Sequence, residues 1–95
     1  MAQFLVRYDQ TGTAELREQM RGEHIAYRKS LGESMLLAGP LLDDTGTPVG
    51  SVIILAATDR EEAERAARQD PFVREGLLTL RSIEPMRIAM ARAAP

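Results

Sequence analysis

Residues 51–57 read Ser-Val-Ile-Ile-Leu-Ala-Ala, and this short stretch decides the fold. From Val52 onward the side chains are apolar at both odd and even positions, which predicts a central strand buried on both faces of its sheet. A chain of 95 residues holds too few elements to cover both faces by itself. We therefore expect a homodimer in which two sheets pack face to face. The alternative is one face that is merely less polar than usual.

The segments around this stretch alternate between strand and helix patterns. An apolar–polar alternation opens the chain, and a helical period follows, with Thr13 as the expected N-cap and Gly32 as the expected C-cap. Thr58 with Glu61 and Asp59 with Glu62 each match a capping box that opens a helix, and Asp70-Pro71 is typical of the start of a short helical turn. We expect strands at residues 2–9, 34–42, 51–57 and 77–90, helices at 14–31 and from 58 to about 69, and a turn at 71–75.

The order β-α-β-β-α-β is that of ferredoxin-like folds. It predicts one α+β domain over residues 1–90 with a four-stranded antiparallel sheet, followed by a frayed tail at 91–95. Two prolines constrain the strands. Gly39-Pro40 predicts a bulge or bend, and Pro85, which has no N–H to donate, places the last strand at an edge or at a bulge.

Composition excludes several classes of protein. Hydrophobic residues make up 44% of the chain and charged residues 27%, which is typical of a soluble globular domain. The formal charge is −2 with both signs scattered, so the basic stripe of a nucleic-acid-binding protein is missing. We find neither a leader-like segment nor an apolar stretch long enough to span a bilayer. We expect a cytoplasmic domain that binds neither nucleic acid nor membranes.

His24 is the one histidine of the chain and lies inside the first expected helix. It falls at the margin of the helix's apolar stripe, which consists of Leu16, Met20, Tyr27 and Leu31, where a side chain is half-buried and can point into a crevice beside the sheet. Imidazole is the side chain best suited to proton transfer near neutral pH, so His24 is a candidate acid or base. The alternative is a histidine at the helix edge without a catalytic role.

Asp70 is the best carboxylate candidate because it precedes Pro71 in an Asp-Pro-Phe turn. The same position suits a structural role, since Asp before a proline at the first helical position is a common N-cap. The two roles are compatible, because a carboxylate that accepts turn N–H groups is held rigidly in its ionised form. If Asp70 only caps the turn, replacement by Asn would be nearly silent.

Cofactor chemistry finds little support in the residues. One histidine and no cysteine do not compose an ordinary zinc site, and Asp43-Asp44 is too short for a calcium loop. Neither of the glycine-rich phosphate-binding motifs G-x-x-x-x-G-K-[ST] and G-x-G-x-x-G occurs. We expect no metal and no organic cofactor.

Several short motifs occur together in a fixed order. Residues 9–24 read DQTGTAELREQMRGEH, and they are followed by Ala38-Gly39-Pro40-Leu41, Gly50-Ser51, the helix start at 59–63, Asp70-Pro71-Phe72 and Gly76-Leu77. This set resembles the YCII-related (YciI-like) family over residues 2–90. The resemblance implies a ferredoxin-like subunit that forms a dimeric α/β barrel, similar in plan to muconolactone isomerase. It also implies an active site at His24 and Asp70.

The function expected on these grounds is a cofactor-independent lyase or isomerase acting on a small, ring-derived or carboxylated metabolite. His24 would be the general acid or base, and Asp70 would orient its imidazole. We expect the substrate to contact Arg17, Gly39, Pro40 and Ser51. The alternative is a dimeric module without catalysis, which binds a small molecule or accompanies a partner protein. The turn at 43–50 and the tail after Ile88 depart from the family pattern, which leaves the substrate open.

Overall fold

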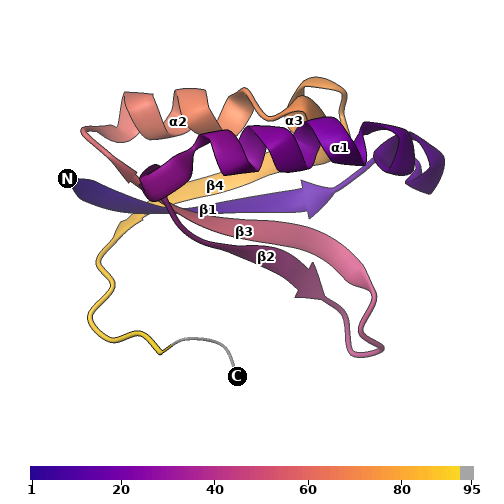
Figure 1. The fold of residues 1–95 in the computed structure, drawn as a ribbon. Coiled ribbons are helices and arrows are strands. Elements are labelled where there is room, and N and C mark those ends of the chain that lie inside the picture. Colours follow the sequence, from indigo (N-terminus) through magenta and orange to yellow (C-terminus); the bar gives the residue numbers. More distant parts are fainter. Residues whose placement is uncertain (93–95) are drawn as a thin grey trace.

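The computed structural model describes residues 1–92 and confirms the expected α+β fold (Figure 1). The strands form one four-stranded antiparallel sheet in the order β2-β3-β1-β4. The elements, in chain order, are β1 (Ala2–Gln10), α1 (Ala14–Ser30), the 3₁₀ turn η1 (Gly32–Ser34), β2 (Met35–Leu42), β3 (Pro48–Ala57), α2 (Arg60–Arg68), α3 (Pro71–Arg74) and β4 (Leu78–Met86).

The three α-helices lie together on one face of the sheet, and the segment after β4 runs along the other side (Figure 1). Alternate residues of the two inner strands point at the helices and are buried, among them Val6 of β1 and Ile53 of β3. From α2, Ala63 and Ala67 complete this core. Their small side chains let the helix backbone lie close to the sheet. No helix among residues 1–92 is long and apolar enough to cross a membrane.

The opposite face of the sheet is apolar on one half and polar on the other. Leu5, Ile54 and Leu37 are cross-strand neighbours and form an apolar row over β1, β3 and β2. On the β4 side of the same face, Arg7 and Glu84 form an ion pair at 3.3 Å. The expected apolar character of both faces of β3 is therefore confirmed, and β3 is an inner strand.

Most helix boundaries follow the predicted capping residues. The Thr13 side chain accepts the Leu16 N–H at 3.2 Å, and Asp59 accepts the Glu62 N–H at 2.8 Å. One expectation is wrong: the C-cap of α1 is Leu31, not Gly32. Gly32 instead follows the cap with φ of 56°, the left-handed conformation that glycine adopts without a steric cost.

The strands differ from the prediction at three places, the first being the start of β3, which lies at Pro48 and not at residue 51. Gly39 and Pro40 pair with β3 in continuous register, and the irregularities of β2 lie before Leu37 and after Leu41 instead. Pro40 fits because β2 is an edge strand, where a missing N–H is tolerated. β4 ends at Met86 and not at residue 90, and Pro85 lies on the other edge of the sheet, as expected. Residues 93–95 of the expected tail lie outside the described residues.

Gly50 lies where two backbones approach closely, so we predict that Gly50→Ala destabilises the fold. A Cβ atom at this position would lie 2.5 Å from the carbonyl oxygen of Tyr8. Because a backbone atom cannot move aside cheaply, we expect a cost of about 1–3 kcal/mol and a lower Tm. Gly22→Ala is the control: it adds a methyl group in α1 with no atom within 4 Å, and is expected to raise the Tm slightly. Equal Tm changes in the two variants would contradict the steric argument.

Candidate active site

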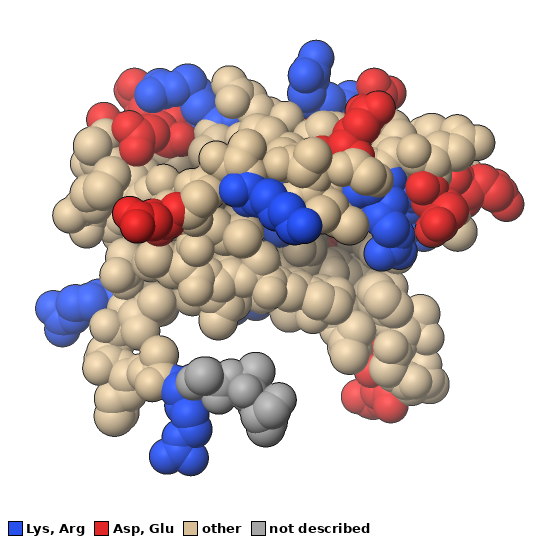
Figure 2. Space-filling model, viewed as in Figure 1, with Lys and Arg blue, Asp and Glu red and all other residues tan. Residues whose placement is uncertain are grey.

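A cavity of about 580 Å³ lies between α1 and the β2–β3 hairpin. Figure 2 shows the hollow on this side of the molecule, with Lys and Arg side chains along its α1 edge. The fold brings five of the six predicted site residues to the walls of this cavity: Arg17, His24, Gly39, Pro40 and Ser51. The sixth, Asp70, lies behind His24 and contacts it directly.

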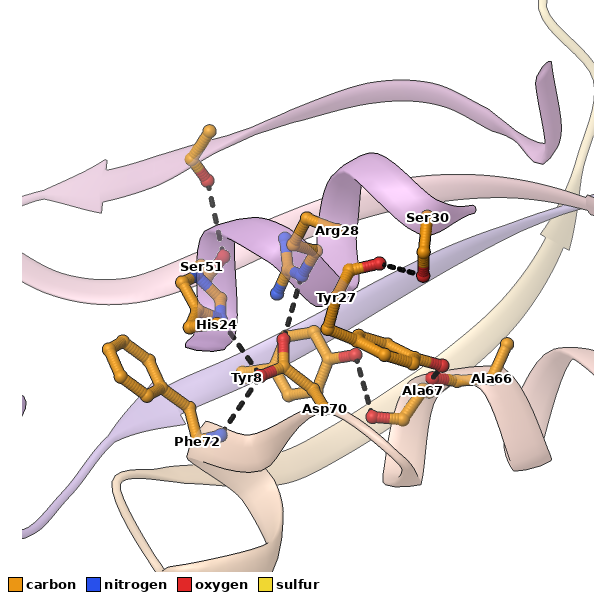
Figure 3. A network of polar contacts seen from close by, with 11 residues as sticks. Tyr8, His24, Tyr27, Arg28, Ser30, Ser51, Ala66, Ala67, Asp70 and Phe72 are labelled. Atoms are coloured by element: carbon orange, nitrogen blue, oxygen red, sulfur yellow. Dashed lines mark hydrogen bonds and ion pairs between the residues drawn. The ribbon is translucent and has the colours of Figure 1, made fainter. Parts of the chain in front are cut away.

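Asp70 is buried to 1% exposure at the N-terminus of α3 (Figure 3). Its Oδ1 accepts the Phe72 N–H at 2.9 Å, which is the predicted N-cap interaction. The same Oδ1 lies 2.8 Å from Nδ1 of His24, and Oδ2 accepts Nε of Arg28 at 2.8 Å. Asp70 therefore caps the turn and at the same time joins α3 to α1.

The hydrogen bonds to Asp70 determine its protonation state. Burial by itself raises the pKa of a carboxyl group, because the charged form loses its hydration. The donors from His24, Arg28 and the Phe72 backbone outweigh this effect and hold the pKa of Asp70 below its usual value. Asp70 is therefore an ionised acceptor at neutral pH.

His24 lies in α1 with its imidazole partly buried, at 19% side-chain exposure. Because the ionised Asp70 can only accept, the Nδ1 atom that contacts it carries a proton. In the neutral imidazole, Nε2 is then the ring nitrogen that can accept a proton. Phe72 stacks on the imidazole with ring centroids 4.0 Å apart and ring planes 1° from parallel, which holds the ring in place.

Arg28 is a member of this site that the sequence reasoning missed. It is 8% exposed, pairs with Asp70, and lies with its guanidinium carbon 5.5 Å from the centroid of the Tyr8 ring. Tyr8 is buried as well, and burial raises the pKa of its hydroxyl, which donates to the Ala67 carbonyl at 3.1 Å. The available signal was spacing, since Arg28 follows His24 by four residues and shares its helix face.

The remaining predicted site residues differ in how many of their polar groups already bind other parts of the protein. The Arg17 guanidinium donates from Nη1 to the carbonyl oxygens of Thr11 and Gly12, at 2.7 and 3.4 Å, so one of its nitrogens braces the loop before α1. Ser51 donates to the Gly39 carbonyl at 3.4 Å. A Cβ at Gly39 would meet nothing within 4 Å, so the backbone there faces open space. Within residues 1–92, no group of three or more His, Cys, Asp or Glu side chains is placed to hold a metal ion.

The position of Arg28 leads to a prediction about the titration of Asp70. We expect the Asp70 carboxyl to titrate below the ordinary Asp value of about 3.9, and Arg28→Met to move its pKa upward, because burial remains while a donor and a positive charge are lost. Since the folded pKa is depressed, the stabilisation is complete above the unfolded value and is lost as the pH falls through the folded one. Carboxyl-detected NMR titration measures both values, and an unchanged pKa in the variant would contradict the role of Arg28.

The geometry of the site can be compared with known proteins. No curated protein matches the sequence significantly. Among solved structures, the fold is similar to 5-chloro-2-hydroxyhydroquinone dehydrochlorinase (TftG) from Burkholderia phenoliruptrix AC1100, solved in complex with 2,5-dihydroxybenzoquinone. The TM-score is 0.69 and the sequence identity 25%, over 96% of each chain.

The sequence also matches a defined domain family along nearly all of its length. The match is to the YCII-related domain and covers residues 1–87, which include every candidate site residue described above. It therefore spans the whole sheet and all the helices. The chain belongs to the YCII-related domain family.

Proposed function

We propose that this protein is a cofactor-independent lyase or isomerase that acts on a small ring-derived or carboxylated metabolite. The observation that carries the proposal is the contact of 2.8 Å between Nδ1 of His24 and the ionised carboxylate of Asp70, beside a cavity of about 580 Å³. Both reaction classes need a group that removes a proton from carbon or oxygen and delivers it elsewhere. The His24–Asp70 pair has the chemistry for this step.

In the proposed mechanism, neutral His24 accepts a substrate proton at Nε2. Asp70 keeps the opposite nitrogen protonated and stabilises the imidazolium that forms. The electron pair left on the substrate then follows one of two courses. In a lyase it forms a new double bond while a leaving group departs with the electrons of its own bond. In an isomerase the imidazolium returns the proton at a different atom of the substrate.

The similarity to TftG supports the substrate class. That protein is named for dehydrochlorination of a hydroxylated chloro-aromatic ring and was solved with a dihydroxyquinone. Dehydrochlorination removes a proton and a chloride ion, which is an elimination of the kind a single general base supports. We propose for this chain the same general class, a small hydroxylated ring or its carboxylated derivative.

A second candidate function is a binding module without catalysis. The same cavity and the same buried pair would then hold a ligand, with Asp70 serving only to cap α3 and to pair with Arg28. The two functions differ in what His24 does, because ligand binding does not require a titrating group at that position. The variants below separate them.

We also propose that two copies associate through the face of the sheet that carries no helix among the described residues. The apolar row Leu5–Ile54–Leu37 crosses three strands there, and Leu37 is 50% exposed. Ile54, in the middle of the row, is 8% exposed, so Leu37 is the member that stands open to a partner. Apolar side chains exposed beside such a row are typical of interfaces between subunits. A second copy presents the same row, so the two faces are self-complementary.

We predict that His24→Gln abolishes turnover without unfolding the protein. Glutamine keeps a polar side chain on α1 but cannot accept and release a proton near neutral pH, so we expect a rate loss of about 10²- to 10⁴-fold. The Tm stays within a few degrees, since Asp70 retains Arg28 and the Phe72 N–H. Chloride release from 5-chloro-2-hydroxyhydroquinone is the first assay, followed by other hydroxylated rings. Full activity in the variant would favour the binding module.

Asp70→Asn tests the second member of the pair, with Asp59→Asn as its matched control. Both aspartates cap a helix, and Asn caps about as well as Asp. Asp59→Asn is therefore expected to be silent. Asp70→Asn also strands the buried charge of Arg28, so we expect a stability loss of about 3–5 kcal/mol in addition to lost turnover. If the two variants behave alike, Asp70 is only a cap.

We predict a dimer in solution and a folded monomer for Leu37→Glu. Light scattering of the wild type should give about twice the chain mass of 10.5 kDa. The substitution places a charge at the β2 end of the apolar row, where it would lose its hydration on association. Because Leu37 is half exposed in the single chain, the fold itself should survive, as judged by circular dichroism. A monomeric wild type would contradict the stacked-sheet arrangement.

A further inference from the structure

The cavity beside His24 carries a charge of opposite sign to that of the whole protein. The chain has a formal charge of −2. The cavity walls, by contrast, combine one acid, Glu18, with four cations: Arg17, Arg21, Arg28 and Lys29. Cavities lined by one sign of charge concentrate ligands of the other sign. Arg28 pairs with Asp70 and Arg21 with Glu18, so Arg17 and Lys29 leave the cavity with a net positive charge, which favours an anionic ligand.

Among these cations, Arg28 is distinguished by burial and by an unused donor. Its Nε donates to Asp70, whereas its terminal nitrogen Nη2 is buried and has no hydrogen-bond partner among residues 1–92. A buried donor of a charged group without an acceptor is costly, and few remain in folded proteins. The guanidinium is held by Asp70 and by the Tyr8 ring, and in Figure 3 its terminal nitrogens point toward the side of His24 and Ser51.

The walls around the guanidinium suit a flat ligand. The stacked rings of His24 and Phe72 border the cavity on one side, and Pro40 and Pro48 border it from the hairpin. Aromatic and proline rings offer flat apolar surfaces against which a planar ring packs. A planar ring between these walls would lie next to both Nε2 of His24 and the guanidinium of Arg28.

We infer that Arg28 is the specificity-determining residue of this site and binds an ionised oxygen on a planar ring substrate. Because Nη2 is buried at the wall of the cavity, the side chain has to shift to present this nitrogen to that oxygen, while Nε keeps its bond to Asp70. Removal of a proton by His24 increases the negative charge on such an oxygen, so Arg28 also stabilises the product of that step. The inference rests on the proposed function and adds to it the chemical class of the substrate, a phenolate or enolate.

The test compares two ring ligands, one that ionises and one that cannot. 2,5-Dihydroxybenzoquinone ionises, whereas its dimethyl ether, 2,5-dimethoxybenzoquinone, cannot. Titration calorimetry should show that the wild-type protein binds the dihydroxy compound at least about tenfold more tightly. Arg28→Met and Arg28→Lys should each remove this preference, with a loss of roughly 10- to 100-fold in affinity for the dihydroxy compound alone. Lysine keeps the charge, but its ammonium is a point donor and lacks the planar fork whose separate nitrogens reach Asp70 and the ligand from different positions.

Arg21→Met is the control for the general charge of the cavity. Arg21 borders the same cavity, but its side chain is 65% exposed and pairs with Glu18 on the surface of α1. Its loss is expected to weaken binding of the dihydroxy compound by less than about threefold, and added salt should remove that effect. A loss as large as in the Arg28 variants would overturn the assignment to Arg28, as would a wild-type protein that binds both quinones equally or neither.

His24→Gln separates this inference from the proposed function. The variant lacks the base but keeps Arg28, so it should retain the preference for the dihydroxy compound while losing turnover. If His24→Gln loses turnover and the Arg28 variants keep the preference, the inference on Arg28 fails and the proposed function stands. If His24→Gln turns over normally while the Arg28 variants lose the preference, the proposed function fails and the anion site remains.

Discussion

The buried carboxylate of Asp70 is the interaction on which the site depends. A charge at 1% exposure is tolerated in a protein interior only when donors surround it, and here three donors do so. One is the backbone N–H of Phe72, and the other two are His24 and Arg28 on α1. The need to satisfy this one anion therefore fixes α1 against α3 and places the imidazole at the wall of the cavity.

The same arrangement divides the work among few side chains. Asp70 keeps one imidazole nitrogen protonated and leaves the other free, and the ring of Phe72 prevents the imidazole from turning. Arg28 balances the charge of Asp70, so that the acid remains ionised despite its burial. The Nε atom of Arg28 binds Asp70, whereas Nη2 has no partner among the described residues. Arg28 therefore links the buried carboxylate to the wall of the cavity.

The two faces of the sheet differ in what covers them. One packs against the helices through small and branched side chains, and its buried Tyr8 ring supports Arg28 from below. The other combines the apolar row Leu5–Ile54–Leu37 with the polar half near β4. In a chain of this length the area available for a core is limited, so association through the apolar half would add the burial that a single copy lacks.

The sequence alone was sufficient for the order of elements, because strand alternation, helix period and the capping residues Thr13, Asp59 and Asp70 are local signals. It also singled out His24 and Asp70 as candidates, through a single histidine and an Asp-Pro turn combined with a family resemblance, and the structure places the two in contact. It could not supply the ends of β4 or the register of Gly39-Pro40, since strand pairing depends on the neighbouring strand. Only the tertiary structure decided that Arg28 shares Asp70 with His24. Arg28 and Asp70 lie 42 residues apart in the sequence and meet only when α1 packs against α3. Helix spacing placed Arg28 on the same face of α1 as His24. Its burial depends on how the helices and the sheet pack together, and the sequence pattern does not show that.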